Sequence, residues 1–436
     1  MRLLSCIVLI TTAANICFSI EPTEKFSWKI FDYLWDNSTQ KQNAIKSGLY
    51  NANASVLYDV DEASDGRTFV TLIKKKGVPA SLTTVSNKTG PSGPFLKPYP
   101  NWSWYNNNYT CNNHTIISVY RISIKCNYLF VLDSGVIESK TVCPPKLLIF
   151  DLKTDELTEH ITIPHDIATH DDKSIGLLVT PIVDIQNCNL DNATIFMADS
   201  YGNGLIKYNK YTGLCRIESD FMKPNNADTT FTVQNQRFHL DNGGILGLTT
   251  IDEVLYYAAL SGHKIFKMNM HDLRNCSKLN KAKTNNLTEL AGTLSGQTGP
   301  IASVQSVLFF SNIPNASILC VDATKQFNSS DTKLIAQDSK NLQFTSGLKV
   351  TKSEEKLLIA TNRLESILGK TLNANEINFR ISEISMKQIR KETNCFASNN
   401  NQSHDNEHKP SLVIYVKYWY SIYIINPFKD LFESFW

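Results

Sequence analysis

Several catalytic signatures are missing from this chain of 436 residues. It has no H-E-x-x-H zinc motif and no phosphate-binding P-loop. No two cysteines have C-x-x-C spacing, which disfavours a zinc ribbon or a thioredoxin-type site. Ser134 is flanked by Leu132 and Val136, where the G-x-S-x-G elbow of a serine hydrolase needs glycines. The sequence therefore predicts a protein that is not an enzyme and that has no metal and no cofactor.

The chain also lacks a strong excess of one charge. Its formal net charge is +2, with Lys and Arg scattered, so no nucleic-acid partner is expected. At the start, Arg2 precedes a short apolar run that begins at the initiator Met, which is typical of a cleaved signal peptide over residues 1–19. This run is too short to span a bilayer well. We expect a secreted, extracellular protein without a transmembrane span.

The stretch 128–166 organises the rest of the chain. Two apolar runs, 129–132 and 147–150, each end in a polar turn, and the alternating run 160–163 is stopped by Pro164. This order indicates an antiparallel meander, and the same pattern recurs in six units spaced by roughly 50–65 residues. The repeat predicts an all-β fold, a six-bladed β-propeller in which each blade covers its neighbours. A large sandwich is the alternative. The first strands of the units centre on Phe69, Phe130, Phe196, Tyr256, Phe309 and Leu358.

The pattern divides the chain into a signal peptide (1–19), a propeller (20–395) and a polar linker with an aromatic tail (396–436). The aromatic residues from Trp28 to Trp35 are expected to pack on the propeller or to complete its last blade. Residues 40–46 predict a short helix ended by Gly48. The Pro- and Gly-rich stretch after Ser86 predicts a long ordered loop. In the tail, Lys417 interrupts an apolar run that is too short for a membrane helix, so the tail either packs on a membrane or partner surface or replaces the ordinary terminus.

Cysteine usage supports secretion. Cleavage of the signal peptide removes Cys6 and Cys17 and leaves an even number, which suits an oxidised framework. A short sequence separation favours the first pair below, and the second would tie neighbouring blades. The predicted pairs are Cys111 with Cys126, Cys143 with Cys188, Cys320 with Cys395, and the remaining Cys215 with Cys276.

Many N-x-S/T sequons occur in the chain, and each lacks an intervening Pro. One sequon alone means little, but a dozen behind a signal peptide predict a surface that carries glycans. The candidate glycosylation sites are Asn37, Asn53, Asn87, Asn101, Asn108, Asn113, Asn192, Asn275, Asn286, Asn315, Asn328 and Asn401.

A series of motifs runs in order through residues 26–395: WKIFDY, AIKSGLY, GVPASL, GPFLKPYPNWSW, LFVLDSG, CPPKLLIFDL, IPHDIA, ADSYGNGLIKY and INFRI. Together they resemble the major royal jelly protein / yellow family of secreted insect proteins, and the royal jelly branch more than the pigmentation branch. The resemblance implies a six-bladed propeller, in agreement with the repeat. Two departures occur: Phe130 stands where the family usually has Trp, and the residues after Cys395 do not match.

The resemblance implies a secreted, glycosylated, non-catalytic propeller that acts in extracellular nutrition, small-ligand carriage, or gland or venom secretion. The partners it implies are a small molecule (an amine or a sterol) in the central channel, a small protein, or further copies of the chain. The alternative is an enzyme, either a yellow-type protein that converts dopachrome in melanin formation or a lactonase-like, calcium-dependent hydrolase. The missing catalytic motifs weigh against the alternative.

Candidate site residues are few. Asn341 and Phe344 look like the Asn and Phe that help to hold the ligand in amine-binding relatives; the alternative is that Asn341 caps a turn and Phe344 packs between blades. Asp133 and Asp199 follow the first strand of two units. Acidic residues near the axis bind calcium in other propellers, but here we expect turn capping through backbone N–H groups. His165 is expected to be structural, and residues 202–204 to form a hairpin turn rather than a nucleotide site.

Overall fold

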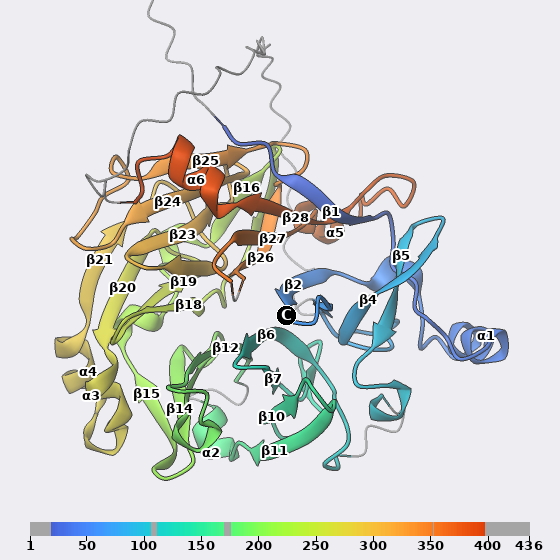
Figure 1. Cartoon of the computed structure of the whole chain (residues 1–436), viewed down its shortest axis with the longest axis horizontal. Coiled ribbons are helices and arrows are strands. Elements are labelled where there is room, and N and C mark those ends of the chain that lie inside the picture. Colours follow the sequence, from blue (N-terminus) through green and yellow to red (C-terminus); the bar gives the residue numbers. More distant parts are fainter. Residues whose placement is uncertain (1–18, 106–110, 170–175, 352, 397–436) are drawn as a thin grey trace, which may run out of the picture.

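The computed structural model describes residues 19–105, 111–169, 176–351 and 353–396. In this part of the chain, six four-stranded antiparallel sheets are arranged radially around a central axis (Figure 1). The fold is therefore the predicted six-bladed β-propeller. Nearly all of the predicted signal peptide and the whole aromatic tail lie outside the described residues.

In the first five blades the strands follow chain order from the axis outward, and the sixth blade ends with the N-terminal strand. The strands are β2 (Leu57–Glu62), β3 (Thr68–Leu72), β4 (Leu82–Gly90) and β5 (Gly93–Pro98) in blade 1; β6 (Val119–Lys125), β7 (Tyr128–Asp133), β10 (Lys146–Asp151) and β11 (Glu156–Thr162) in blade 2; β12 (Leu178–Asp184), β13 (Thr194–Asp199), β14 (Gly204–Asn209) and β15 (Gly213–Glu218) in blade 3; β18 (Ile245–Ile251), β19 (Val254–Ala259), β20 (Lys264–Asn269) and β21 (Glu289–Thr293) in blade 4; β22 (Ile301–Val304), β23 (Val307–Asn312), β24 (Ser317–Asp322) and β25 (Lys333–Gln337) in blade 5; and β26 (Phe344–Val350), β27 (Lys356–Asn362), β28 (Phe379–Ser385) and β1 (Thr23–Trp28) in blade 6.

Short helices and hairpins lie in the connections between these strands. Two small hairpins and six helices belong to this group: β8 (Val136–Ile137) with β9 (Lys140–Thr141), β16 (Thr230–Val233) with β17 (Gln236–His239), α1 (Ser38–Lys46), α2 (His165–Ala168), α3 (Met270–Arg274), α4 (Lys281–Leu287), α5 (Leu364–Leu368) and α6 (Met386–Glu392).

The residues that marked the repeat occupy equivalent places. Each predicted centre lies on the second strand of its blade, and all six side chains are buried. These strands read as continuous apolar runs because a neighbouring blade covers each face of the sheet. Burying one large apolar side chain contributes about 1.5–3 kcal/mol, so the inter-blade layers form the core.

The N-terminal strand closes the ring. β1 pairs antiparallel with β28, and Trp28 lies opposite Phe379. The Phe31 ring packs 4.6 Å from the Phe379 ring, centroid to centroid, and both are fully buried. Both predicted alternatives occur in this segment: Trp28 ends the strand that completes the last blade, whereas Phe31 and Tyr33 pack on the propeller. Because both ends of the described chain share one sheet, opening the ring requires breaking that sheet.

Successive strands alternate in direction, so the connections that enter the innermost strands share one face with the turns between second and third strands. We call this the crossover face, and the opposite one, which holds the turns between first and second strands, the turn face. Side chains link the innermost strands of neighbouring blades. Asp59 and Asp61 on β2 accept the backbone N–H groups of Ile122 and Ile124 on β6, at 3.1 and 2.9 Å. These bonds satisfy N–H groups on the inner edge of a blade.

The described residues contain four disulfides, and two of the four predicted pairs are wrong. Cys111 and Cys126 do not pair, because the seven-residue strand β6 lies between them and carries the chain from the crossover face to the turn face. Cys143 and Cys188 lie on opposite faces for the same reason. The observed bonds are Cys111–Cys143 on the crossover face, Cys126–Cys188 on the turn face, and the two confirmed pairs Cys215–Cys276 and Cys320–Cys395.

The prediction of a long loop after Ser86 is also wrong. That stretch forms the end of β4 and the outer strand β5, joined by a tight turn in which Gly90 pairs with Gly93. An outermost strand tolerates Pro94 and Pro98 because one of its edges has no ladder to complete. The predicted helix is confirmed as α1, which is capped by the Asn37 side chain.

Candidate functional site

The predicted ligand residues lie where the chain enters blade 6. Asn341 donates from its backbone and from Nδ2 to the two carboxylate oxygens of Asp338, at 3.0 and 2.7 Å, and its carbonyl accepts a hydrogen bond from Thr361. Phe344 is the first residue of the innermost strand β26 and is 3% exposed. The two residues are close in the sequence, and Asn341 is bonded to Asp338 and Thr361 whereas Phe344 is buried. Their role toward a ligand stays a prediction.

A hairpin from another part of the propeller covers Phe344. β16 and β17 belong to the connection between blades 3 and 4, yet β17 packs against α5 of blade 6. The Phe238 ring lies 6.5 Å from the Phe344 ring and is stacked on Phe231, with centroids 5.3 Å apart. Gln297 donates to the carbonyl oxygens of Asp228, just before the hairpin, and of Thr230, its first residue, at 3.0 and 2.9 Å. The hairpin is therefore a cover over the predicted ligand residue.

The sequence analysis missed an aromatic cluster on the innermost strands β2 and β6. The rings of Tyr58 and Tyr120 meet edge to face at 5.3 Å. The guanidinium of Arg121 lies 5.2 Å from the Tyr58 ring centroid, a contact worth about 0.5–2 kcal/mol. All three residues are buried, and Nε of Arg121 has no hydrogen-bond partner. In the sequence, each of these tyrosines stands next to a charged residue. The two innermost strands therefore do not form the apolar runs from which the other strands were predicted.

Burial sets the protonation of these rings. It raises the pKa of Tyr120 far above its ordinary value and also raises the pKa of Tyr58, against the opposing effect of the nearby Arg121 charge. Both hydroxyls therefore keep their protons at physiological pH. The cluster offers ring faces and hydroxyl groups, and it has no reactive phenolate.

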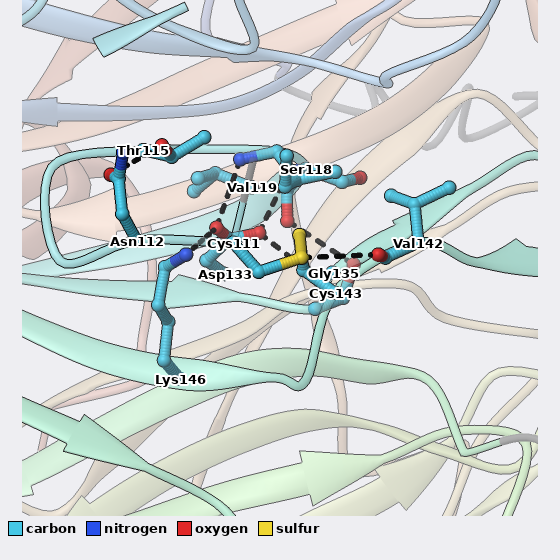
Figure 2. Close-up of polar contacts among 12 residues, drawn as sticks. Cys111, Asn112, Thr115, Ser118, Val119, Asp133, Gly135, Val142, Cys143 and Lys146 are labelled. Carbon is cyan, nitrogen blue, oxygen red and sulfur yellow. Dashed lines mark hydrogen bonds and ion pairs between the residues drawn. A yellow bond between two sulfur atoms is a disulfide. The ribbon is translucent and has the colours of Figure 1, made fainter. Parts of the chain in front are cut away.

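Asp133 holds the crossover face of blade 2 together (Figure 2). Its Oδ2 accepts the N–H of Ile117 at 2.9 Å, and its Oδ1 accepts those of Ser118 and Gly135 at 2.8 and 3.0 Å. Lys146 lies 3.3 Å from Oδ2, and both side chains are buried. The predicted turn-capping role is confirmed, since both carboxylate oxygens are occupied by donors of the protein.

Asp199 has the same position and the same task in blade 3. Its Oδ1 accepts the N–H groups of Leu177 and Gly202, both at 2.8 Å, and its Oδ2 is paired with Arg216 at 2.9 Å. Burial raises the pKa of Asp199, and Arg216 opposes that shift. The turn that follows, residues 200–203, joins β13 to β14 as a hairpin, which confirms the predicted reading of 202–204. Neither aspartate is arranged as a calcium ligand.

The remaining predicted residues lie at the surface. His165 begins the short helix α2 and is exposed. Of the twelve sequons, Asn108 and Asn401 lie outside the described residues, and the asparagine of every other one is exposed. The exposed sites are Asn37, Asn53, Asn87, Asn101, Asn113, Asn192, Asn275, Asn286, Asn315 and Asn328.

The described residues contain neither a cluster of metal ligands nor a helix that could cross a membrane. No group of three or more His, Cys, Asp or Glu side chains there could hold a metal ion. No helix in the same residues is both long and apolar enough to cross a membrane. These observations define the class of protein. The described part of the chain is a six-bladed β-propeller with disulfides and with aromatic residues on the innermost strands at its crossover face.

Comparison with known proteins narrows this class. The family model for major royal jelly protein matches residues 117–395. Major royal jelly protein 9 of Apis mellifera is 34% identical over 386 residues, which cover 85% of this chain and 89% of that protein. Major royal jelly protein 8 of the same organism is 33% identical over 390 residues, covering 85% and 92%. The chain belongs to the major royal jelly protein family.

The similarity to solved structures is low. A virginiamycin B lyase from Staphylococcus aureus is 10% identical with a TM-score of 0.38, covering 77% of this chain and 97% of the lyase. The assignment of six blades rests on the six sheets themselves.

Proposed function

We propose that this protein is a secreted, glycosylated propeller of the royal jelly type that carries a small ligand at the crossover-face mouth of its channel and has no catalytic activity. Its setting would be extracellular nutrition, ligand carriage, or a gland or venom secretion. Family membership, four disulfides and the exposed sequons support this setting.

The observation that carries ligand binding is the chemistry of the innermost strands. Tyr58 and Tyr120 present ring faces beside the buried guanidinium of Arg121, and Phe344 begins the innermost strand of blade 6. Small-molecule sites have this composition, with mostly aromatic and apolar walls and few polar groups. The carboxylates that could do chemistry on this face, Asp133 among them, are occupied by backbone N–H groups.

The ligand is either a small amine or a sterol. An amine would place its cation on the Phe344 ring and donate to the amide oxygen of Asn341, whereas a sterol would use ring faces alone. Either ligand must displace the Phe238 cover to reach Phe344. We therefore expect that shortening the side chain of Phe238 does not weaken ligand binding, whereas shortening Asn341 or Phe344 does.

Titration calorimetry with serotonin and with cholesterol, on wild type and variants, tests this proposal. We expect Asn341→Ala to weaken amine binding at an unchanged melting temperature. Phe344→Ala should weaken amine binding too, measured below the lower melting temperature that the loss of a buried ring produces. Phe238→Ala should bind at least as tightly as wild type. A sterol ligand would be weakened by Phe344→Ala but not by Asn341→Ala. Absence of binding of both compounds to wild type would refute ligand carriage.

Catalysis is tested separately. Purified protein should convert neither dopachrome nor lactones above background. A robust turnover that is lost in Asp133→Asn or Asp199→Asn would overturn the non-catalytic proposal. A small-protein partner and self-association are further expectations from the family, and size-exclusion chromatography with light scattering on the secreted protein measures both.

A further inference from the structure

A recess lies beside blade 1, between residues of the N-terminal segment, Lys41 of α1 among them, and the β4–β5 hairpin. Figure 1 shows α1 and this hairpin on the outer side of the propeller. One wall is formed by residues 30–32 with Lys41, Tyr50 and Ala52, and the other by residues 90–93 with Phe95. Its volume is about 300 Å³, at the lower end of the range for small-molecule sites. None of the channel residues discussed above lines it.

The two walls are fixed to each other by the backbone. Lys29 donates its N–H to the carbonyl of Ser92 at 2.9 Å, and Leu96 donates to the carbonyl of Asp32 at 2.9 Å. Gly93 has a φ of +131°, and a Cβ there would lie 2.4 Å from a carbonyl oxygen of β1, so only glycine allows this approach. The recess is therefore preformed, which lowers the entropic cost of binding.

Two aromatic side chains, Tyr50 and Phe95, line the recess. Phe31 is fully buried, and its carbonyl accepts the hydroxyl hydrogen of Tyr50 at 2.8 Å. The Phe95 ring lies over Gly90, where a Cβ would come within 2.8 Å of the ring. These contacts hold the rings in place, so the recess presents fixed apolar surfaces suited to a planar group.

One ion pair supplies the charge. Lys41 Nζ lies 2.5 Å from Asp32 Oδ2 and 6.0 Å from the Tyr50 ring centroid. Asp32 Oδ1 accepts the N–H of Tyr33 at 2.8 Å and the indole N–H of Trp35 at 3.0 Å, so that the carboxylate is held with Oδ2 toward Lys41. Both side chains are partly exposed, and such a pair adds little to stability. It leaves one positive and one negative group side by side at a preformed apolar recess.

We propose that this recess binds a zwitterionic α-amino acid with an aromatic side chain. The ligand ammonium donates to Asp32 Oδ2, and the ligand carboxylate accepts from Lys41 Nζ. Each charge of the ion pair thereby gains a charge-assisted partner, and the bound complex carries no unbalanced charge. The ligand ring lies beside Tyr50 and Phe95. A compound with only one of the two charges meets a like charge on Asp32 or on Lys41.

Calorimetry with L-tryptophan and two of its analogues tests this assignment. We expect tryptophan to bind at least tenfold more tightly than tryptamine, which lacks the carboxylate, and indole-3-propionate, which lacks the ammonium. If either analogue binds as tightly as tryptophan, or if tryptophan does not bind, the assignment is wrong.

Variants locate the site. Lys41→Met and Asp32→Asn should each weaken tryptophan binding at least tenfold at an unchanged melting temperature, and Ala52→Phe should block the recess without touching the ion pair. Lys46→Met, on the exposed last turn of the same helix, is the matched control and should bind normally. Normal binding in Ala52→Phe, or loss of binding in Lys46→Met, would contradict the proposal.

Discussion

Asp61 makes the stability of the propeller depend on pH. Its side chain is buried on the innermost strand β2, where Oδ1 accepts the N–H of Glu62 and Oδ2 that of Ile124, both at 2.9 Å. Burial raises its pKa from the ordinary 3.8 to about 6, although Lys349 and the two N–H groups act in the opposite direction. The net rise in the pKa of Asp61 therefore already includes the lowering effect of these partners.

The sign of the effect follows from the direction of the shift. Because the folded-state pKa lies above the unfolded value, the folded protein holds this proton more tightly, and the stability from Asp61 is complete below about pH 4 and is lost as pH rises through 6. A shift of about two units is worth about 3 kcal/mol. Asp61→Asn cannot ionise and keeps an oxygen for the N–H of Ile124. We expect the variant to exceed wild type by up to about 3 kcal/mol at pH 7.5 and to match it at pH 4.

Thermal unfolding at several pH values with disulfides intact measures this difference. A domain of this size unfolds with an entropy of about 0.8 kcal/mol/K, so the variant should melt about 4 °C above wild type at pH 7.5. Asp241→Asn, in an exposed turn, is the matched control and should follow wild type at every pH. An Asp61→Asn curve that runs parallel to wild type from pH 4 to 7.5, or one that falls below it at pH 7.5, would refute this reasoning.

Three further predictions concern stability. Burial raises the pKa of Glu365 to about 7, so Glu365→Gln should gain melting temperature over wild type at pH 8 but not at pH 5, as measured by differential scanning fluorimetry. Replacing Cys126 and Cys188 together by Ser removes the bond between blades 2 and 3 and should cost about 2–5 kcal/mol, read from urea midpoints. Asp133→Ala removes the acceptor of three N–H groups and the partner of a buried lysine, so calorimetry should show a loss of about 3–5 kcal/mol.

The blades could be predicted from the sequence because their second strands are covered on both faces. Such a strand needs apolar residues at almost every position, so runs such as 129–132 and 195–198 stand out from the polar turns that follow them. The innermost strands are different. β2 reads LYDVDE, with acidic residues that bond to the neighbouring blade, and no local pattern marks it as a strand of the core.

The disulfide pairs show what sequence distance leaves out. Cys111 and Cys126 are close in the chain, but a strand runs between them from one face of the propeller to the other. Cys126 and Cys188 occupy the turns between first and second strands in neighbouring blades, and they meet because these turns share the turn face. Knowing the face of each turn, and not only the number of blades, would have given the right pairs.

The cover over Phe344 could not be predicted for a similar reason. Phe238 lies more than one hundred positions before Phe344 and in the connection to a different blade, and their contact depends on where the β16–β17 hairpin folds over the propeller. The sequence marks that hairpin only by a short alternating pattern, which says nothing about its destination.

One polar feature is repeated on the crossover face. A polar residue ends the second strand in four blades and bonds to backbone or side-chain groups of the connections beside it. Asp133 and Asp199 accept N–H groups of the incoming connection, Asn312 donates to Ser295, and Asn362 donates to the carbonyl of Leu57 in the next blade. A carboxylate or amide used in this way ties the end of a second strand to the connection beside it. These bonds hold together the channel mouth at which we propose that a ligand binds.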